Sequence, residues 1–204
     1  MSDFFADDKL IGLNNLVDGD TEFIPLISPE DEDRMNLEEV PEKLPILPLR
    51  NNVLFPGVVI PITLGRDKSI KLIQDAYKGN KIIGVVSQKD SSIEEPTYKD
   101  LYDIGSVAQI VKMLKMPDGT STIIIQGKKR LKLEEEISNE PYLIAKIKEF
   151  DEKRLKNISK ESVALFDSLK DMALNIIKNS PNIPSEASFA VKNIESPNFL
   201  VNFI

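Results

Sequence analysis

Two short runs of β-prone residues flank a turn early in the chain, and the later pattern builds on them. Residues 44–49 and 58–64 are largely apolar, and the turn between them carries the pair Pro56-Gly57. Both runs contain prolines, which have no N–H to donate to a neighbouring strand; these are Pro45, Pro48 and Pro61. We therefore predict two strands that lie at the edge of a sheet or at the rim of a barrel.

Beyond the second run the pattern becomes helical and then returns to strands. Asp67 is expected to cap a helix that ends at Gly79. Residues 81–88 form an apolar run of strand length, which is typical of a strand covered on both faces. Residues 104–150 indicate an antiparallel meander that includes a hairpin, because the pair Asp118-Gly119 supplies the backbone that a tight turn needs.

The order of these elements favours an α+β fold. Several short strands with one early helix predict a β-rich, partly open barrel or sandwich with one crossover helix. After residue 151 apolar residues recur every three or four positions, which predicts a long helix over 159–178. Ser185 and Ser196 are expected to cap two further helices. An all-helical subdomain should thus follow the β-rich one, and the apolar ending at Ile204 suggests a truncated chain.

The first 43 residues differ from the rest in charge. They hold 13 Asp and Glu against 3 Lys and Arg, so their net charge is −10, whereas the remainder carries +3. Since they lack sustained apolar periodicity, we predict a largely disordered acidic leader, although residues 23–27 offer a short segment for docking. The predicted division is therefore an acidic leader over 1–43, a β-rich subdomain over 44–150 and a helical subdomain over 151–204.

Composition excludes several classes of site. The chain has no Cys and no His, which excludes disulfides, thiolate or imidazole metal sites and Ser-His or Cys-His nucleophiles within it. The two glycines with phosphate-loop spacing, Gly79 and Gly84, are followed by Val85-Val86 instead of Lys-Ser or Lys-Thr. No signal peptide or membrane span is apparent. We expect a soluble cytoplasmic protein with no membrane partner and no catalytic, cofactor-binding or metal-binding residues in this chain.

The two early runs and their turn also match a longer pattern. It reads Pro-x-Leu-Pro-Leu-Arg-(Asn/Asp)-x-Val-x-(Phe/Tyr)-Pro and, after four residues, Pro-(Leu/Ile)-x-x-Gly-Arg. The matching residues are Pro45, Leu47, Pro48, Leu49, Arg50, Asn51, Val53, Phe55, Pro56, Pro61, Ile62, Gly65 and Arg66. Later blocks at 85–89, 100–108, 113–120 and 125–130 follow in the same order. From about residue 44 onward the chain resembles the N-terminal domain of the Lon ATP-dependent serine proteases.

The resemblance implies a domain that selects and positions unfolded or damaged protein substrates and contributes to assembly of a homohexamer. In such proteases ATP, Mg²⁺ and a Ser-Lys dyad belong to downstream modules. The parent protein is thus expected to be an ATP-dependent endopeptidase of protein quality control, whereas this chain is non-catalytic. Residues 117–121 superficially resemble a catalytic serine loop, but their place between two strands favours a hairpin turn. The alternative is a stand-alone, non-catalytic module that binds protein or RNA.

Residues beside the predicted hairpin turn are one candidate for substrate contact. Met113, Leu114 and Met116 are apolar, and methionine repacks readily against varied partners. The alternative is that strand alternation buries Leu114 and Met116 in the core.

The loop between the first two strands is the other candidate, through Leu54, Phe55 and Pro56. Here the favoured alternative is that Phe55 is a buried plug of the barrel.

Two further features of the sequence allow more than one interpretation. The basic cluster Lys128, Lys129, Arg130 and Lys132 is where RNA would bind. However, three glutamates follow it and no aromatic residue is interleaved, so a solvated strand edge is favoured and nucleic acid is an unlikely partner. The apolar face of the helix over 159–178 either packs on its neighbours or forms a subunit contact, and periodicity does not separate the two.

Overall fold

The structure is a computed structural model that describes residues 34–35, 37–115, 120–150, 159–183 and 186–204. The chain divides into two compact units. One, the helical unit, contains the described residues between 160 and 194. The other, the sheet unit, contains the described residues from 34 to 159 together with residues 195–204.

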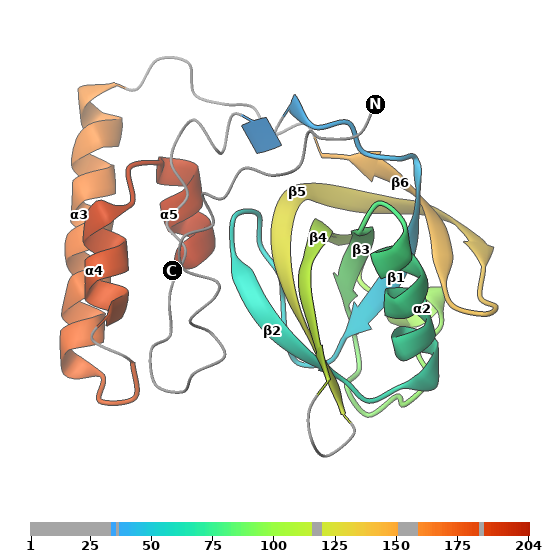
Figure 1. Ribbon diagram of the computed structural model, residues 1–204. Helices are drawn as coiled ribbons and strands as arrows, with labels where there is room; N and C mark the ends of the chain where they lie inside the picture. Colours follow the sequence, from blue (N-terminus) through green and yellow to red (C-terminus); the bar gives the residue numbers. More distant parts are fainter. Residues whose placement is uncertain (1–33, 36, 116–119, 151–158, 184–185) are drawn as a thin grey trace, which may run out of the picture. The chain divides into compact units, whose positions relative to one another are not determined.

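The sheet unit is built on six strands in the order β2-β5-β4-β3-β1-β6, with an additional pairing between β5 and β6 (Figure 1). Their bounds are β1 (Lys43–Leu49), β2 (Val59–Leu64), β3 (Ile82–Ser87), β4 (Ile104–Lys115), β5 (Ser121–Ser138) and β6 (Ile144–Glu149). The first part of the 18-residue β5 pairs with β2 and β4, and its last part pairs with β6. The β5–β6 pairing closes five strands into a barrel, which confirms the predicted β-rich α+β fold.

Only one of the two early strands is an edge strand. β2 pairs with β5 alone, as predicted, but β1 pairs with β6 over 43–45 and with β3 over 46–49. Each half of β1 therefore pairs with a neighbouring strand mainly along one of its two edges. The carbonyl of Pro48 accepts a hydrogen bond from the Arg66 guanidinium at 3.4 Å. The edge of β1 at which Pro48 lacks an N–H therefore faces the side chain of Arg66. Pro48 is thus tolerated in β1, although β1 is an interior strand of the sheet.

Two apolar cores hold the sheet unit together. One contains Leu47, Ile83 and Ile110 and receives the helix α2 (Asp67–Lys78) through Leu72 and Ile73. The other is formed by alternate residues of the same strands and by β6, including Leu44, Ile46, Val86, Val107, Leu131 and Ile147. β3 contributes to both cores, which confirms that it is covered on both faces.

The ends of α2 differ in part from the prediction. The N-cap residue is Arg66, and Asp67 is the first helical residue, without a side-chain cap. The prediction of Asp67 as the cap is therefore wrong, but its carboxylate still lies in the first turn, where it interacts favourably with the helix dipole. Gly79 ends the helix as predicted, and its N–H donates to the carbonyl of Ala76 at 3.0 Å.

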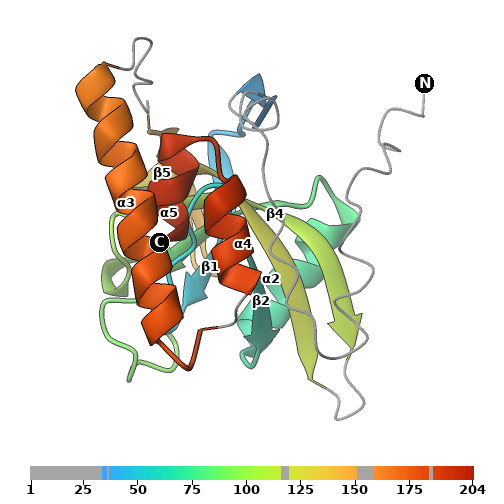
Figure 2. The ribbon, with the colours of Figure 1, turned by 90° about the vertical axis from the view of Figure 1, so that its left-hand side faces the viewer.

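The helical unit consists of α3 (Lys160–Asn179) and α4 (Glu186–Asn193), which lie side by side (Figure 2). Ala173 of α3 is buried, and the Lys170 ammonium donates to the carbonyl of Lys192 at 3.3 Å. The long helix predicted over 159–178 is thus confirmed. The predicted cap Ser185 lies outside the described residues.

The third helix, α5 (Pro197–Phe203), begins as predicted, because the Ser196 hydroxyl accepts from the Phe199 N–H at 3.2 Å. It groups with the sheet unit and not with α3 and α4. The side chain of Asn202 links α5 to the sheet unit: it accepts from the Arg130 guanidinium at 2.7 Å and donates to the carbonyl of Pro56 at 3.4 Å. The predicted boundaries near 43 and 151 stay predictions. The segments 23–27 and 151–156 lie outside the described residues.

Burial of α2 on the sheet gives a direct test of this fold. Ile73 is fully buried, so Ile73→Ala should lower the free energy of unfolding in urea by about 2–5 kcal/mol. The neighbouring Lys71→Ala removes an exposed i,i+4 ion pair with Asp75 and should cost less than about 0.5 kcal/mol. Equal losses for the two variants would show that α2 does not pack as described.

Candidate functional site

The loop between β1 and β2 contains a sharp turn over residues 55–58. Pro56 occupies its second position and Gly57 its third, with φ of 84° at Gly57. The Val58 N–H donates to the carbonyl of Phe55 at 3.2 Å. These are the features of a type II turn, in which glycine at the third position avoids the strain of a left-handed backbone.

Backbone contacts fix this turn on β5. The Gly57 N–H donates to the Gly127 carbonyl, and the Gly127 N–H donates to the Val58 carbonyl, each at 2.9 Å. A Cβ on Gly127 would lie 2.2 Å from the carbonyl oxygen of Phe55, so only glycine permits this approach. The buried Ser106 hydroxyl also donates to the carbonyl of Leu54 at 2.6 Å.

This anchoring decides which loop residue is buried. Leu54 is 4% exposed and belongs to the first core, whereas Phe55 is 40% exposed. The interpretation of Phe55 as a buried plug is therefore wrong, because the turn directs the preceding leucine inward. Pro56 is partly exposed. Of the three loop candidates, Phe55 offers the most exposed side chain.

Other exposed apolar side chains lie at the same end of the sheet. The Ser87 hydroxyl donates to the carbonyl of Asn52, and the Tyr102 N–H donates to the carbonyl of Ser87 at 3.0 Å. These bonds bring the loop beside the start of β4. We define the loop patch as the exposed side chains of Val53, Phe55, Tyr102 and Ile104, which are 59%, 40%, 52% and 50% exposed.

Sequence reasoning did not find Tyr102 and Ile104. They follow a short 3-10 turn over 98–100 and have Asp103 between them, so they carry no apolar run. Val53 lies in the family pattern over 45–66, and Tyr102 and Ile104 lie in the family block over 100–108, but neither block marks them as contact residues. The only sequence signal for Tyr102 and Ile104 is that these apolar residues flank a charged one just before a predicted strand.

Met113 and Leu114, beside the hairpin, lie on the opposite faces of β4 from those that strict strand alternation predicts. The β4–β5 register shifts between Ile110 and Lys112, which marks a bulge, and a bulge moves the next side chain to the other face. Met113 consequently packs against the first core, while Leu114 is half-buried and is not part of it. The expected burial of Leu114 by alternation is wrong for this reason. Met116 lies outside the described residues.

The structure does not bring the two candidate sets together. β2 runs antiparallel to β5, with Val59 opposite Gln126 and Leu64 opposite Ser121. The loop patch therefore adjoins one end of this strand pair and the hairpin the other, about 17 Å apart at 3.4 Å per residue.

The basic cluster has partners inside the sheet unit. Lys128 pairs with Glu38 at 3.5 Å and Lys129 with Glu149 at 3.0 Å, and Arg130 donates to Asn202. Both lysine side chains are only 11% exposed. Since three of the four cations serve internal contacts, the cluster is not the exposed basic strip that RNA binding needs.

Among the described residues, no group of three or more Asp and Glu is arranged to hold a metal ion. Within the same residues no helix is long and apolar enough to cross a membrane.

Residues 43–204 match the family model described as the ATP-dependent protease La (LON) substrate-binding domain. The chain belongs to this Lon family. It is 58% identical over 200 residues to the Lon protease of Flavobacterium johnsoniae, covering 96% of this chain and 24% of that protein. It is 50% identical over 183 residues to the Lon protease of Cytophaga hutchinsonii, covering 90% of this chain and 22% of that one.

Solved structures support the same Lon N-terminal fold. The N-terminal domain of Mycobacterium avium complex Lon protease matches with a TM-score of 0.62 at 19% identity, over 78% of this chain and 80% of that domain. The Lon N-terminal domain protein from Xanthomonas campestris matches with a TM-score of 0.52 at 16% identity, over 78% and 94%. The chain thus spans about a quarter of the length of the curated Lon proteases that it resembles.

The close approach at Gly127 predicts how the loop responds to substitution. Gly127→Ala should push the carbonyl of Phe55 away and break both hydrogen bonds to β5, so hydrogen exchange at the Gly57 amide should accelerate by at least about tenfold. Gly65→Ala is a matched control, because a Cβ at Gly65 meets nothing within 4 Å. Unchanged exchange at Gly57 in Gly127→Ala would contradict the described anchoring.

Proposed function

We propose that this chain is the part of a Lon-type ATP-dependent protease that recognises and positions unfolded or damaged protein substrates. The match of residues 43–204 to the Lon substrate-binding domain carries the proposal. The sequence has no phosphate-binding loop, and the role proposed for this part of the protease is recognition and not catalysis. ATP with Mg²⁺ and the Ser-Lys dyad belong to the remaining length of the whole protease, which acts in the cytoplasm.

The loop patch is the surface proposed to contact substrates. Phe55 stays in water because β5 holds the turn over 55–58 in place, and the other three side chains of the patch are more exposed than Phe55. An unfolded protein exposes apolar segments, and covering them together with this patch removes apolar area from water on both sides. Such contacts need no defined sequence, which suits a domain that meets many different substrates.

The hairpin is a second proposed contact, through Met113, Leu114 and Met116. Leu114 is half-buried and lies one residue before the end of β4, so it has surface left to offer. Leu54 contributes only by holding Phe55 in place, since its own side chain is buried.

Self-association is the assembly role that we propose for α3. Leu165, Met172 and Ile176 are 71%, 54% and 57% exposed, and with Leu169 they recur at spacings of four, three and four residues. This is the spacing of a coiled-coil seam. Glu161 lies in the first turn and Lys178 in the last, so an antiparallel second copy would place opposite charges side by side.

Substrate recognition is tested with a permanently unfolded protein and its folded counterpart. The triple variant Val53→Ser, Phe55→Ser and Tyr102→Ser should weaken binding of the unfolded form by about tenfold or more, as expected when buried apolar contacts are lost. Ile137→Ser removes a side chain of similar exposure, 44%, outside the loop patch and should leave affinity unchanged. Fluorescence anisotropy measures both.

Three results separate the proposed surfaces. Unchanged affinity in the triple variant, with loss in the pair Leu114→Ser and Met116→Ser, assigns binding to the hairpin. Loss in neither set rejects both surfaces. A steeply salt-dependent affinity for RNA would instead favour the stand-alone RNA-binding alternative.

Self-association is tested by sedimentation of the chain over a range of concentrations. Met172→Lys places a charge in the seam and should weaken the dimer by at least about tenfold. Asn175→Lys adds the same charge to an exposed position of α3 outside the seam and should have little effect. A monomeric wild-type chain, or equal weakening by both variants, would reject α3 as the contact.

A further inference from the structure

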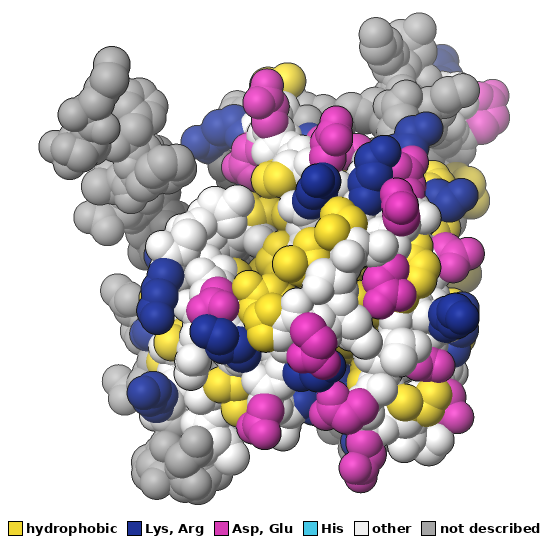
Figure 3. Space-filling model, turned by 90° about the vertical axis from the view of Figure 1, so that its right-hand side faces the viewer, with side chains coloured by type: hydrophobic (Ala, Val, Ile, Leu, Met, Phe, Trp, Pro, Cys, Tyr) yellow, Lys and Arg dark blue, Asp and Glu magenta, His cyan; other side chains and the backbone are white. Residues whose placement is uncertain are grey.

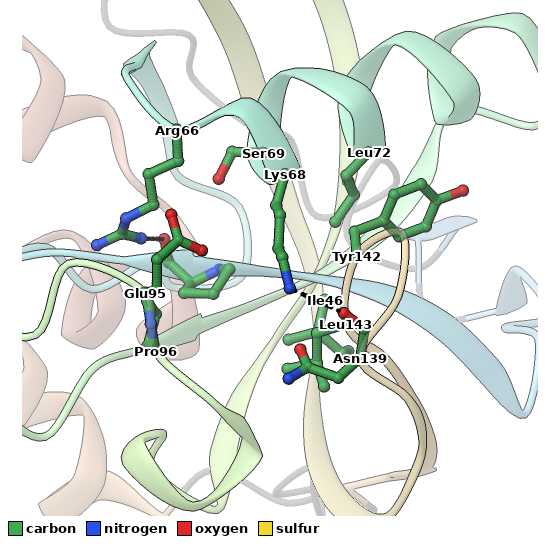
Figure 4. Close-up of a pocket in the computed structure, with 11 residues that line it drawn as sticks. Ile46, Arg66, Lys68, Ser69, Leu72, Glu95, Pro96, Asn139, Tyr142 and Leu143 are labelled. Atoms are coloured by element: carbon green, nitrogen blue, oxygen red, sulfur yellow. Dashed lines mark hydrogen bonds between the residues drawn. The ribbon is translucent and has the colours of Figure 1, made fainter.

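Side chains from distant elements hold two loops of the sheet unit in place. One of these places is a pocket at the start of α2, which Arg66 and Lys68 border (Figure 4). Arg66 donates to the side chain of Gln88 and to the carbonyl of Pro48, and Lys68 pairs with Glu140 at 2.7 Å. Seen from the right-hand side of Figure 1, where α2 lies, hydrophobic side chains gather in the middle of the face and charges of both signs surround them (Figure 3). The charged groups at this pocket thus serve contacts within the sheet unit.

The second place is the turn over 55–58, which α5 reaches through one side chain. The Asn202 side chain donates to the carbonyl of Pro56 at 3.4 Å, and its oxygen accepts from the Arg130 guanidinium at 2.7 Å. Asparagine suits this position because it carries a donor and an acceptor on one planar group. α5 groups with the sheet unit, and it therefore contacts the turn that presents Phe55.

One peptide group of this turn is held from both sides. The Pro56 carbonyl and the Gly57 N–H belong to the same trans peptide, so they point in opposite directions. The N–H donates to the carbonyl of Gly127 in β5 at 2.9 Å, and the carbonyl accepts from Asn202. The Pro56–Gly57 peptide is therefore fixed by β5 on one side and by α5 on the other.

This peptide is also the group whose direction distinguishes two types of turn. Type I and type II turns differ mainly by a rotation of the central peptide, which takes φ of the third residue from about −90° to about +80°. Glycine accepts both values at little cost, and the observed φ of 84° at Gly57 is that of type II. Rotation to type I would break the bonds to Gly127 and to Asn202 together. The turn thus has two discrete conformations, and α5 contacts the group that decides between them.

We propose that Asn202 is a positioning residue for substrate contact at the loop patch. Its bond to the Pro56 carbonyl stabilises the type II turn relative to type I by the amount typical of one hydrogen bond. In the type I turn the bond between Gly57 and Gly127 is lost, so Phe55 is held less firmly and more conformational freedom is lost when a substrate binds. The affinity of the loop patch for an unfolded segment therefore depends on α5.

This inference rests on the proposed function of the loop patch and adds a coupling between the patch and α5. The turn is the two-state element through which the two sites act on each other. Docking of α5 and binding at Phe55 favour the same conformation of the turn, so each strengthens the other. Occupancy of the loop patch thereby becomes available to any element that contacts α5.

Asn202→Asp separates this role from simple docking of α5. The carboxylate still accepts from Arg130 but places an oxygen against the Pro56 carbonyl, which favours rotation of the peptide. Hydrogen exchange at the Gly57 amide should accelerate by about tenfold. Exchange at the amide of Leu200, a buried residue of α5, should stay unchanged.

Affinity for a permanently unfolded protein is measured on the same variant by fluorescence anisotropy. Asn202→Asp should weaken binding by about three- to tenfold, as expected for the loss of one hydrogen bond. Asn198→Asp makes the same chemical change at an exposed position of α5, so it should alter neither the affinity nor exchange at Gly57. Circular dichroism checks that both variants are folded.

The outcomes separate this inference from the function on which it rests. Unchanged exchange at Gly57 in Asn202→Asp overturns it, and so does equal acceleration at Gly57 and Leu200, which would show that Asn202 only docks α5. Faster exchange at Gly57 with unchanged affinity also overturns it, and loss of affinity in the triple variant then still supports the loop patch. If the wild-type chain does not bind the unfolded protein, the proposed function fails. Exchange at Gly57 in Asn202→Asp then decides alone whether α5 selects the turn.

Discussion

The sheet unit depends on one long strand with three different neighbours. β5 begins beside β2, runs along β4 and ends beside β6. Register shifts between Leu133 and Glu135 and between Glu136 and Ser138 let its last part follow β6, because bulges bend a strand and increase its twist. Without this strand β2 would have no partner and the barrel would stay open between β4 and β6.

The exposed apolar residues are a consequence of the same strand. A loop that carries Phe55 into water would normally be unstable, since folding favours burial of aromatic rings. Here the backbone of Gly127 holds the loop so closely that Leu54 takes the inward position and Phe55 is left outside. Leu54 therefore contributes to the stability of the core, while the next residue, Phe55, stays exposed. In this way a surface suited to binding persists in a well-packed unit.

The sequence predicted what local patterns determine and missed what neighbours determine. Apolar runs, turn residues and caps sufficed for the strands, for α2 and α3 and for the Ser196 cap. They did not reveal the bulge beyond Ile110, which moved Met113 to the core face, because a bulge depends on pairing between strands. The partners of Lys128 and Lys129 were equally invisible, since Glu38 and Glu149 are distant in sequence. Val53, Tyr102 and Ile104 all lie in blocks that resemble the family, but their common place at one end of the sheet depends on the hydrogen bonds around Ser87.

The placement of α5 has a mechanical consequence. The helical unit is inserted into the sheet unit, because the chain leaves the sheet before α3 and returns to it with α5. A pulling force on Ile204 would therefore act first on α5 and pass through Asn202 to Arg130 of β5 and to the turn at Pro56. The α3–α4 pair lies in a closed loop of the chain and would carry load only after α5 had detached. Tension at this end thus reaches the barrel and the turn that presents Phe55 before it reaches the two helices.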